Sequence, residues 1–137
     1  MITHSSEETL ALGRTIGEQL KSGQLVCLFG ELGAGKTTLI KGIVAGASGC
    51  SPDEVSSPTF VYHAVYEGKM TVHHFDLYRL KGADQFLELG FEEYFHTDGA
   101  CCIEWAERIK EIVPDDAVRV VASHTPEGNR EFVIDGL

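Results

Sequence analysis

The chain has 137 residues, of which 43% are hydrophobic and 23% charged, and its formal net charge is -10. This length suits one folded domain, and no stretch approaches the roughly 20 apolar residues that a transmembrane helix needs. The negative charge argues against direct binding of DNA or RNA, which would need a strongly basic patch. The first dozen residues lack the basic start of a secretion or import signal. We therefore expect one cytoplasmic domain over residues 1–137, with no membrane segment and no DNA partner.

The first three predicted elements are a helix, a strand and a second helix. Ser5, followed three residues later by Glu8, is a capping-box pattern, and apolar residues then recur at helical spacing over 6–22. The continuous apolar run 25–29 is typical of a central strand that is covered on both faces. Residues 36–47 carry an apolar stripe at helical spacing. A glycine-rich loop therefore connects a buried strand to a helix.

The middle of the chain combines a loop, a hairpin and short helices. Residues 49–58 are rich in Gly, Ser, Pro and Asp, which predicts an exposed, mobile connection. The runs 60–66 and 70–76 are rich in β-forming residues and are joined by three residues that include a glycine, so they predict an antiparallel hairpin. Residues 83–96 are apolar at helical spacing but are interrupted by Gly90, which favours two short helical pieces.

The last third of the chain predicts a further central strand and a closing hairpin. The apolar run 100–103 predicts the strand, and a short helix follows through Val113, where Pro114 stops it. The runs 118–122 and 130–134 flank a turn region and predict the hairpin. The fold class that results is α/β, a single small domain with a mixed sheet. Its central part is expected to be parallel and flanked by helices and antiparallel hairpins.

The glycine-rich loop matches the complete phosphate-binding pattern, Gly30-x-x-x-x-Gly35-Lys36-Thr37. Its glycines let backbone N–H groups approach phosphate oxygens, and the helix N-terminus favours negative charge. Lys36 would place a cation beside the β and γ phosphates, and Thr37 would bind Mg²⁺ through its hydroxyl. We expect ATP and Mg²⁺ as cofactors. The residues expected to line this site are Gly30, Glu31, Leu32, Gly33, Ala34, Gly35, Lys36, Thr37 and Thr38.

Two carboxylates follow predicted strands and are candidates for the metal site. Glu104 ends the run 100–103, and Asp76 ends the run 70–76. Mg²⁺ prefers hard oxygen ligands, so either carboxylate could contact it directly or through water. We favour Glu104 as the ligand because its strand is apolar throughout. Asp76 would then orient the attacking water or hold a metal-bound water, although an exposed strand end with no function remains open for either residue.

Several polar and aromatic residues near these motifs have weaker signals. The segment Ser57-Pro58-Thr59 leaves the flexible connection, so Thr59 could sense the γ-phosphate, but a turn without a ligand explains the composition equally well. Arg79 could neutralise charge in the transition state or form a surface ion pair. His73 and His74 would face opposite sides of their strand, so packing is the default for both. Trp105 is expected to pack near the nucleotide.

Taken in order, these motifs resemble the bacterial TsaE family, small ATPases of tRNA threonylcarbamoyladenosine synthesis. The phosphate loop is followed by Ser57-Pro58-Thr59-Phe60, then by His74-Phe75-Asp76-Leu77-Tyr78-Arg79, and finally by Ile103-Glu104-Trp105. The resemblance implies an ATPase that works with TsaD and TsaB type proteins, which modify adenosine 37 of tRNAs that read codons beginning with A. It implies contact with tRNA only through that complex.

The resemblance also implies roles for individual residues. Thr37 and Glu104 would ligate Mg²⁺, Asp76 would assist hydrolysis, and the Ser-Pro-Thr segment would respond to the γ-phosphate. By position, Ser6 and Arg130 would contact the nucleotide. The catalytic residues are therefore expected to be Lys36, Asp76 and Glu104, and the metal site is expected to involve Thr37, Glu104 and Asp76.

Other functions share the phosphate loop. A small-molecule kinase usually closes an arginine-bearing lid over the phosphates, and no lid segment is evident. A regulatory GTPase would carry a guanine-reading Asn-Lys-x-Asp segment, and this sequence has none. A nucleotide-gated binding module with negligible turnover stays open as an alternative, as does a kinase.

Overall fold

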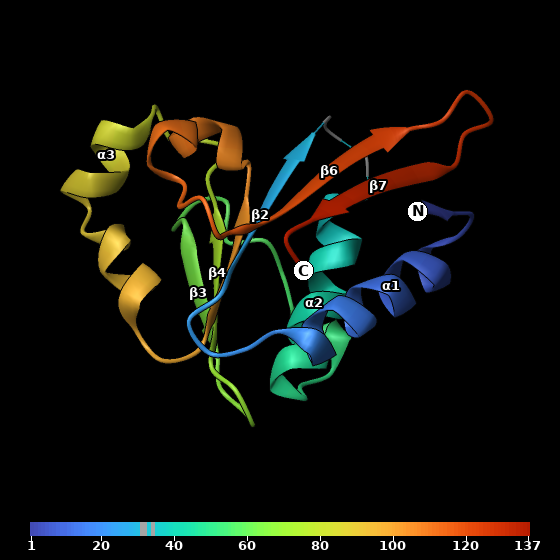
Figure 1. Ribbon diagram of the computed structural model, residues 1–137, viewed down its shortest axis with the longest axis horizontal. Helices are drawn as coiled ribbons and strands as arrows, with labels where there is room; N and C mark the ends of the chain where they lie inside the picture. Colours follow the sequence, from blue (N-terminus) through green and yellow to red (C-terminus); the bar gives the residue numbers. More distant parts are fainter. Residues whose placement is uncertain (31–32, 34) are drawn as a thin grey trace.

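The computed structural model describes residues 1–30, 33 and 35–137, which form a seven-stranded sheet with helices on both faces (Figure 1). The strands are β1 (Ile2–Thr3), β2 (Leu25–Gly30), β3 (His63–Tyr66), β4 (Val72–Asp76), β5 (Ala100–Glu104), β6 (Val118–His124) and β7 (Arg130–Asp135). The α-helices are α1 (Ser6–Gln19), α2 (Lys36–Ser48) and α3 (Ala83–Glu88), and the 3-10 helices are η1 (Pro52–Glu54), η2 (Phe91–His96) and η3 (Ala106–Ile112). Within these described ranges, no helix combines the length and apolar character needed to cross a membrane.

The sheet has the order β1-β7-β6-β2-β5-β4-β3. Its four central strands, β6, β2, β5 and β4, pair in parallel. The outer strands β3, β7 and β1 pair antiparallel to their neighbours. The predicted α/β class and the two predicted hairpins are therefore confirmed. In parallel strands the carboxyl ends lie at the same edge of the sheet, so the ends of β2, β4 and β5 are brought together.

Helices α1 and α2 cover one face of the sheet and touch through glycines (Figure 1). A Cβ on Gly17 of α1 would overlap the carbonyl oxygen of Ile43, and a Cβ on Gly46 of α2 would overlap that of Arg14. The two backbones are in contact because these positions carry no side chain. The helix that begins at the phosphate loop is therefore held directly by the first helix of the chain.

Helix α3 and the 3-10 helices η2 and η3 cover the opposite face. Phe86 and Ile109 are fully buried there against Phe75 of β4 and Ile103 of β5. Alternation along β4 places His73 and Phe75 toward this second core, and Val72, His74 and Asp76 toward α2. The side chains that carry chemistry therefore face the helix that follows the phosphate loop.

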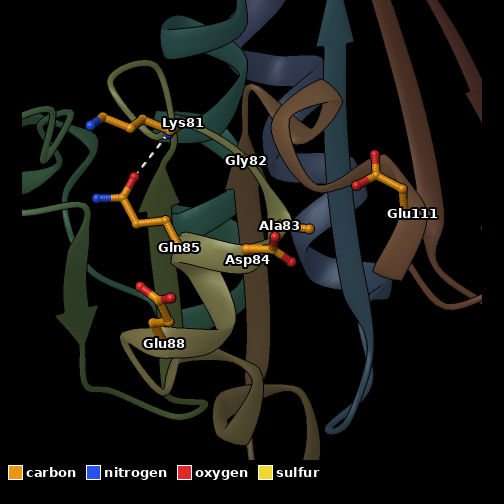
Figure 2. Close-up of a pocket in the computed structure, with 7 residues that line it drawn as sticks. All are labelled: Lys81, Gly82, Ala83, Asp84, Gln85, Glu88 and Glu111. Carbon is orange, nitrogen blue, oxygen red and sulfur yellow. Dashed lines mark hydrogen bonds between the residues drawn. The ribbon is translucent and has the colours of Figure 1, made fainter.

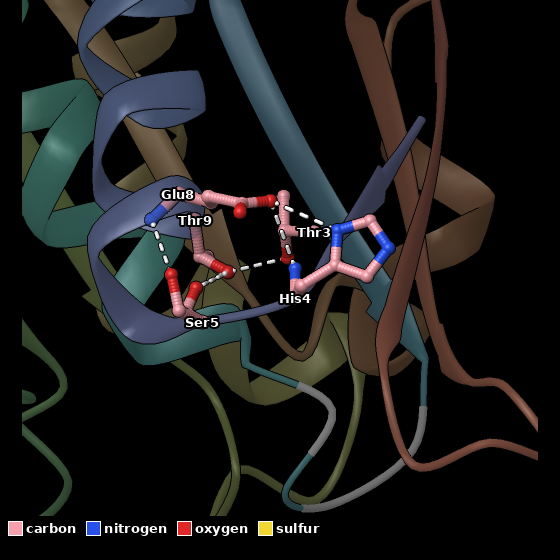
Figure 3. Close-up of polar contacts among 5 residues, drawn as sticks. All are labelled: Thr3, His4, Ser5, Glu8 and Thr9. Carbon is pink, nitrogen blue, oxygen red and sulfur yellow. Dashed lines mark hydrogen bonds and ion pairs between the residues drawn. The ribbon is translucent and has the colours of Figure 1, made fainter.

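A small polar network joins β1 to the start of α1 (Figure 3). Ser5 Oγ accepts a hydrogen bond from the Glu8 backbone N–H at 3.1 Å, which confirms the predicted cap. The carboxylate of Glu8 accepts from the backbone N–H of His4 rather than from that of Ser5, at 3.0 Å, so the reciprocal half of the capping box is shifted by one residue. The hydroxyls of Thr3 and Thr9 lie 2.6 Å apart. This network fixes the first turn of α1 beside the edge of the sheet.

Some predicted boundaries were wrong. The first helix ends at Gln19 rather than at 22, because Leu20 is extended and turns into the core. The strand predicted from 60 begins at His63, since Tyr62 has a left-handed backbone with φ 68°. The helix before Pro114 is of the 3-10 type and is broken at Ile109, where φ is -126°.

Candidate functional site

The phosphate loop connects the end of β2 to the start of α2, as the sequence predicted. Gly30 has φ 128°, and a Cβ there would overlap the carbonyl oxygen of Ala122 on β6. Gly35 has φ 87° and precedes Lys36, the first residue of α2. Both positions therefore require glycine for conformational reasons. The predicted loop residues Glu31, Leu32 and Ala34 lie outside the residues that the structure describes.

Lys36 points back across the loop. Its Nζ donates to the carbonyl oxygen of Gly30 at 2.8 Å and lies 3.5 Å from the centre of the Trp105 ring. The side chain is buried, and this burial lowers the pKa of Lys36. The negative charges of Glu107 and of the two candidate carboxylates act in the opposite direction and raise the pKa. A buried ammonium group held over an aromatic ring is a concentrated positive charge at the mouth of the loop.

A cavity of about 270 Å³ brings seven of the predicted site residues together. It is lined by Gly33, Gly35, Lys36, Thr37, Thr38, Glu104, Trp105 and Arg130. A second cavity of about 240 Å³ shares Gly35, Thr38 and Arg130 with it and also contains Ser6. Ser6 and Arg130 are brought together because β1 pairs with β7, with Thr3 opposite Arg130. The two cavities therefore adjoin each other at the start of α2.

The two candidate carboxylates lie side by side at the carboxyl ends of β4 and β5. Asp76 and Glu104 are register partners and are only 3% and 4% exposed. Asp76 Oδ1 accepts from the backbone N–H of Tyr78 at 3.1 Å, and its Oδ2 accepts from Thr59 at 2.8 Å. Glu104 Oε1 has no hydrogen-bond partner among the described residues. Of the two carboxylates, Glu104 is therefore the one that is not already held by side-chain hydrogen bonds among the described residues.

The segment that precedes β3 touches both the start of α2 and Asp76. Ser57 Oγ lies 3.5 Å from Thr37 Oγ1, and Thr59 donates to Asp76. The sequence had left open whether this segment was a simple turn, and the structure places it against the predicted site. Arg79, for which an arginine finger and an ion pair were both open, lies 4.5 Å from the exposed ring of Phe60.

Two non-glycine residues with left-handed backbones flank the carboxylates. Trp105, with φ 61°, follows Glu104 directly, and the carbonyl oxygen of Tyr62, with φ 68°, accepts from the Asp76 N–H at 2.9 Å. Bulky residues rarely adopt this conformation, and such strain gathers at functional sites. The left-handed conformation of Trp105 ends β5 at Glu104 and turns the indole ring over Lys36.

Sequence reasoning missed two neighbours of the loop. Glu107 Oε2 accepts from the backbone N–H of Gly30 at 2.8 Å. His124, at the end of β6, lies 3.3 Å from Arg130 NH1, and its ring borders Gly33. Neither belongs to a recognisable motif. Only the sheet order, which places β6 beside β2, brings His124 to the loop.

A larger cavity of about 550 Å³ lies elsewhere, between the start of α3 and η3 (Figure 2). Asp84, Glu88 and Glu111 border it, and its Lys81 backbone N–H donates to Gln85 Oε1 at 2.9 Å. None of its described lining residues is among the predicted site residues. Its acidic lining repels phosphate, so size alone does not identify the nucleotide site.

Donor chemistry at the loop fits a magnesium nucleotide. The N-terminus of α2 has no side-chain cap, so its backbone N–H groups can receive an anion. Lys36 supplies a positive charge, and the Thr37 hydroxyl and the Glu104 carboxylate are hard oxygen donors on residues that line the same cavity. Comparison with known proteins identifies a family to which nearly the whole chain is similar. A model of the family "Threonylcarbamoyl adenosine biosynthesis protein TsaE" matches residues 3–132.

The chain belongs to the TsaE family.

Curated members of the TsaE family align over nearly the whole chain. A protein of Treponema pallidum named tRNA threonylcarbamoyladenosine biosynthesis protein TsaE is 36% identical over 133 residues, 97% of each chain. The protein of the same name from Bacillus subtilis is 37% identical over 136 residues, 98% of this chain and 84% of the relative. The crystal structure of Bacillus subtilis YdiB superposes with a TM-score of 0.80 at 32% identity. The superposition covers 98% of this chain and 82% of the YdiB chain, so the comparison confirms the fold.

Proposed function

We propose that this TsaE family member binds ATP with Mg²⁺ and hydrolyses it in support of tRNA threonylcarbamoylation. The observation that carries the proposal is that Lys36, Thr37 and Glu104 line one cavity at the N-terminus of α2. The Glu104 side chain on that cavity is not held by a hydrogen bond to another described residue. A cation, a helix N-terminus and hard oxygen ligands are the groups that a nucleoside triphosphate with Mg²⁺ requires.

Each residue has a defined task in this proposal. Thr37 and Glu104 would hold Mg²⁺, whose charge would neutralise the phosphate oxygens. Lys36 would exchange its bond to Gly30 for the β and γ phosphates. Asp76, held by Thr59 and by the Tyr78 N–H, is oriented to accept a proton from a water molecule or to position it.

The Ser57–Thr59 segment supplies the response to the γ-phosphate. Ser57 lies beside Thr37, and Thr59 is bonded to Asp76, so this segment already touches both sides of the proposed metal site. A ligand that draws Thr37 toward Mg²⁺ would change the contacts of both side chains. The segment would therefore adopt different positions with ATP and with ADP, as switch segments do. Ser6 and Arg130, on the adjoining cavity, would contact the remainder of the nucleotide.

The biological role follows from the family. Its curated relatives carry the name tRNA threonylcarbamoyladenosine biosynthesis protein TsaE. We propose that this chain acts with TsaD and TsaB type proteins and meets tRNA only through them. A net charge of -10 agrees with indirect contact, since direct binding of a phosphate backbone requires a basic surface. Access to tRNA would place the protein in the cytoplasm.

Phosphate release by the purified chain tests the ATPase assignment. The unmodified protein, Lys36→Ala and Glu104→Ala are compared at several Mg²⁺ concentrations, with Lys41→Ala as a control on the same helix. We expect Lys36→Ala to abolish hydrolysis and Glu104→Ala to weaken it, while Lys41→Ala resembles the unmodified protein. Unchanged rates in both site variants would contradict the assignment. Transfer of the γ-phosphate to a metabolite instead of water would favour a kinase.

A further inference from the structure

His74 is a buried histidine that the proposed mechanism does not use. It lies on β4, is 0% exposed, and neither ring nitrogen has a hydrogen-bond partner among the described residues. Buried polar groups are almost always paired, and an imidazole nitrogen without a partner is costly. Packing alone would be served better by an apolar side chain. A ring nitrogen of His74 would therefore gain from a hydrogen-bond partner that comes within reach when the site binds its ligand.

The geometry of the sheet shows which partner it is. On β4, His74 and Asp76 face α2, and on β5, Cys102 and Glu104 face the same way. Because His74 pairs in register with Cys102, and Asp76 with Glu104, His74 lies diagonally across from Glu104. The two side chains therefore face each other in the core between the sheet and α2.

The side chains of His74 and Glu104 approach each other closely. His74 Nε2 lies 3.9 Å from Glu104 Oε1, and this carboxylate oxygen also lacks a partner among the described residues. The separation is about 1 Å longer than a hydrogen bond, so a small rotation of the carboxylate would close it. Two unpaired, buried and complementary atoms thus face each other at the proposed metal ligand.

We propose that His74 is a positioning residue for Glu104: its Nε2–H donates to the Glu104 carboxylate and orients it toward Mg²⁺. The inference rests on the proposed function. A carboxylate that binds a metal ion with one oxygen is commonly held through the other by a neighbouring donor, and loss of that donor weakens metal binding. His74 performs this task from inside the core, without reaching the nucleotide.

Isosteric amides separate this role from simple packing. The side-chain nitrogen of glutamine reaches about as far as histidine Nε2, and that of asparagine corresponds to Nδ1. His74→Gln therefore retains the donor that faces Glu104, His74→Asn presents one at the wrong position, and His74→Leu has none. His73→Leu is the matched control, since His73 is on the same strand but faces His63 and Tyr94 on the opposite side.

Trp105 provides a readout that does not depend on turnover. It is the only tryptophan of the chain, and its ring lies 3.5 Å from Lys36 Nζ. Mg²⁺ is titrated into each full-length variant in the presence of ATP, and Trp105 fluorescence is followed together with phosphate release. Thermal unfolding of each variant without ligand reports its folding.

We expect the Mg²⁺ concentration at half-maximal response to rise about tenfold or more in His74→Leu and His74→Asn. His74→Gln and His73→Leu should stay close to the unmodified protein, and the affinity for ATP without Mg²⁺ should be unchanged in all four. Equal Mg²⁺ dependence in every variant would overturn the inference. So would losses in His74→Gln as large as those in His74→Leu, because shape rather than the donor would then matter. A lack of any response to Mg²⁺ and ATP in the unmodified protein would contradict the proposed function itself.

Discussion

Thr59 donates its hydroxyl to Asp76 Oδ2 at 2.8 Å and thereby joins the segment before β3 to a buried carboxylate at the end of β4. The second oxygen of Asp76 accepts from the Tyr78 N–H at 3.1 Å, so the carboxylate is held from two sides. Such a group keeps one orientation without a metal ion. It is therefore suited to position a water molecule, whereas the Glu104 side chain is not held by a hydrogen bond to another described residue.

The first prediction concerns this hydrogen bond. Thr59→Val keeps the shape of the side chain but removes the donor, so Asp76 loses one of its two supports. We expect ATP turnover to fall about fivefold, since one positioning hydrogen bond contributes about 1 kcal/mol. ADP affinity should change little, and Thr59→Ser should restore most of the rate. Steady-state kinetics with ADP titrations measure both quantities, and equal turnover in Thr59→Val and the unmodified protein would count against a role for Thr59.

A second prediction assigns the two carboxylates to different steps. Asp76→Asn should lower kcat about 100-fold or more, because it removes a proton acceptor, yet leave the Mg²⁺ dependence of nucleotide binding intact. Glu104→Gln should instead raise the Mg²⁺ concentration needed for binding. Trp105 fluorescence and phosphate release separate the two effects. The reverse pattern would show that Asp76 is the ligand and Glu104 the residue that assists hydrolysis.

The third prediction concerns the contact between α1 and α2. Gly17→Ala would push a methyl group into the backbone of α2 at Ile43, and we expect a loss of about 1–3 kcal/mol in the free energy of unfolding. Gly82→Ala is the control, since Gly82 has an extended backbone and open space around its Cα. Urea denaturation of both variants checks this. Equal stability would mean that the helices separate easily.

The fourth prediction concerns acid sensitivity. Burial, together with His73 and His74, lowers the pKa of His63 from its ordinary value of 6.5 to about 4. Between these values the unfolded chain binds a proton that the folded protein does not, so the free energy of unfolding falls as the pH is lowered from 6.5 to 4. Partial exposure of His63 limits the loss to about 2 kcal/mol.

Urea denaturation at pH 7 and pH 5 tests this expectation. His63→Phe keeps the stacking on Phe75, whose ring centre lies 4.5 Å away, but cannot bind a proton. Its stability should therefore depend less on pH than that of the unmodified protein. The same pH dependence in both would exclude His63 as the cause.

The sequence predicted the elements of the fold well where a single periodicity dominates. The apolar runs at β2 and β5 and the stripe on α2 have one pattern each, and all three elements were confirmed. Boundaries failed where tertiary contacts decide them. Leu20 leaves the helix to enter the core, and Tyr62 adopts a left-handed backbone beside Asp76, and neither effect has a local signal.

The sequence predicted that the motif residues would lie together, but not which residues surround them. Lys36 and Thr37 belong to a fixed pattern, Glu104 was favoured because its strand is fully apolar, and all three line one cavity. Glu107 and His74 reach the site only through the sheet order and register, which connect residues far apart in sequence. A sequence alone shows that a carboxylate ends a strand, but not which neighbour faces it.

Multiple-turnover threonylcarbamoylation of tRNA by TsaD and TsaB type proteins tests the central claim most directly. Modified adenosine is measured over time without this chain, with it, and with Lys36→Ala. Continued turnover should require the unmodified chain, and Lys36→Ala should fail to support it. Equal accumulation of modified tRNA in all three reactions would contradict a role for this chain as the ATPase of the pathway.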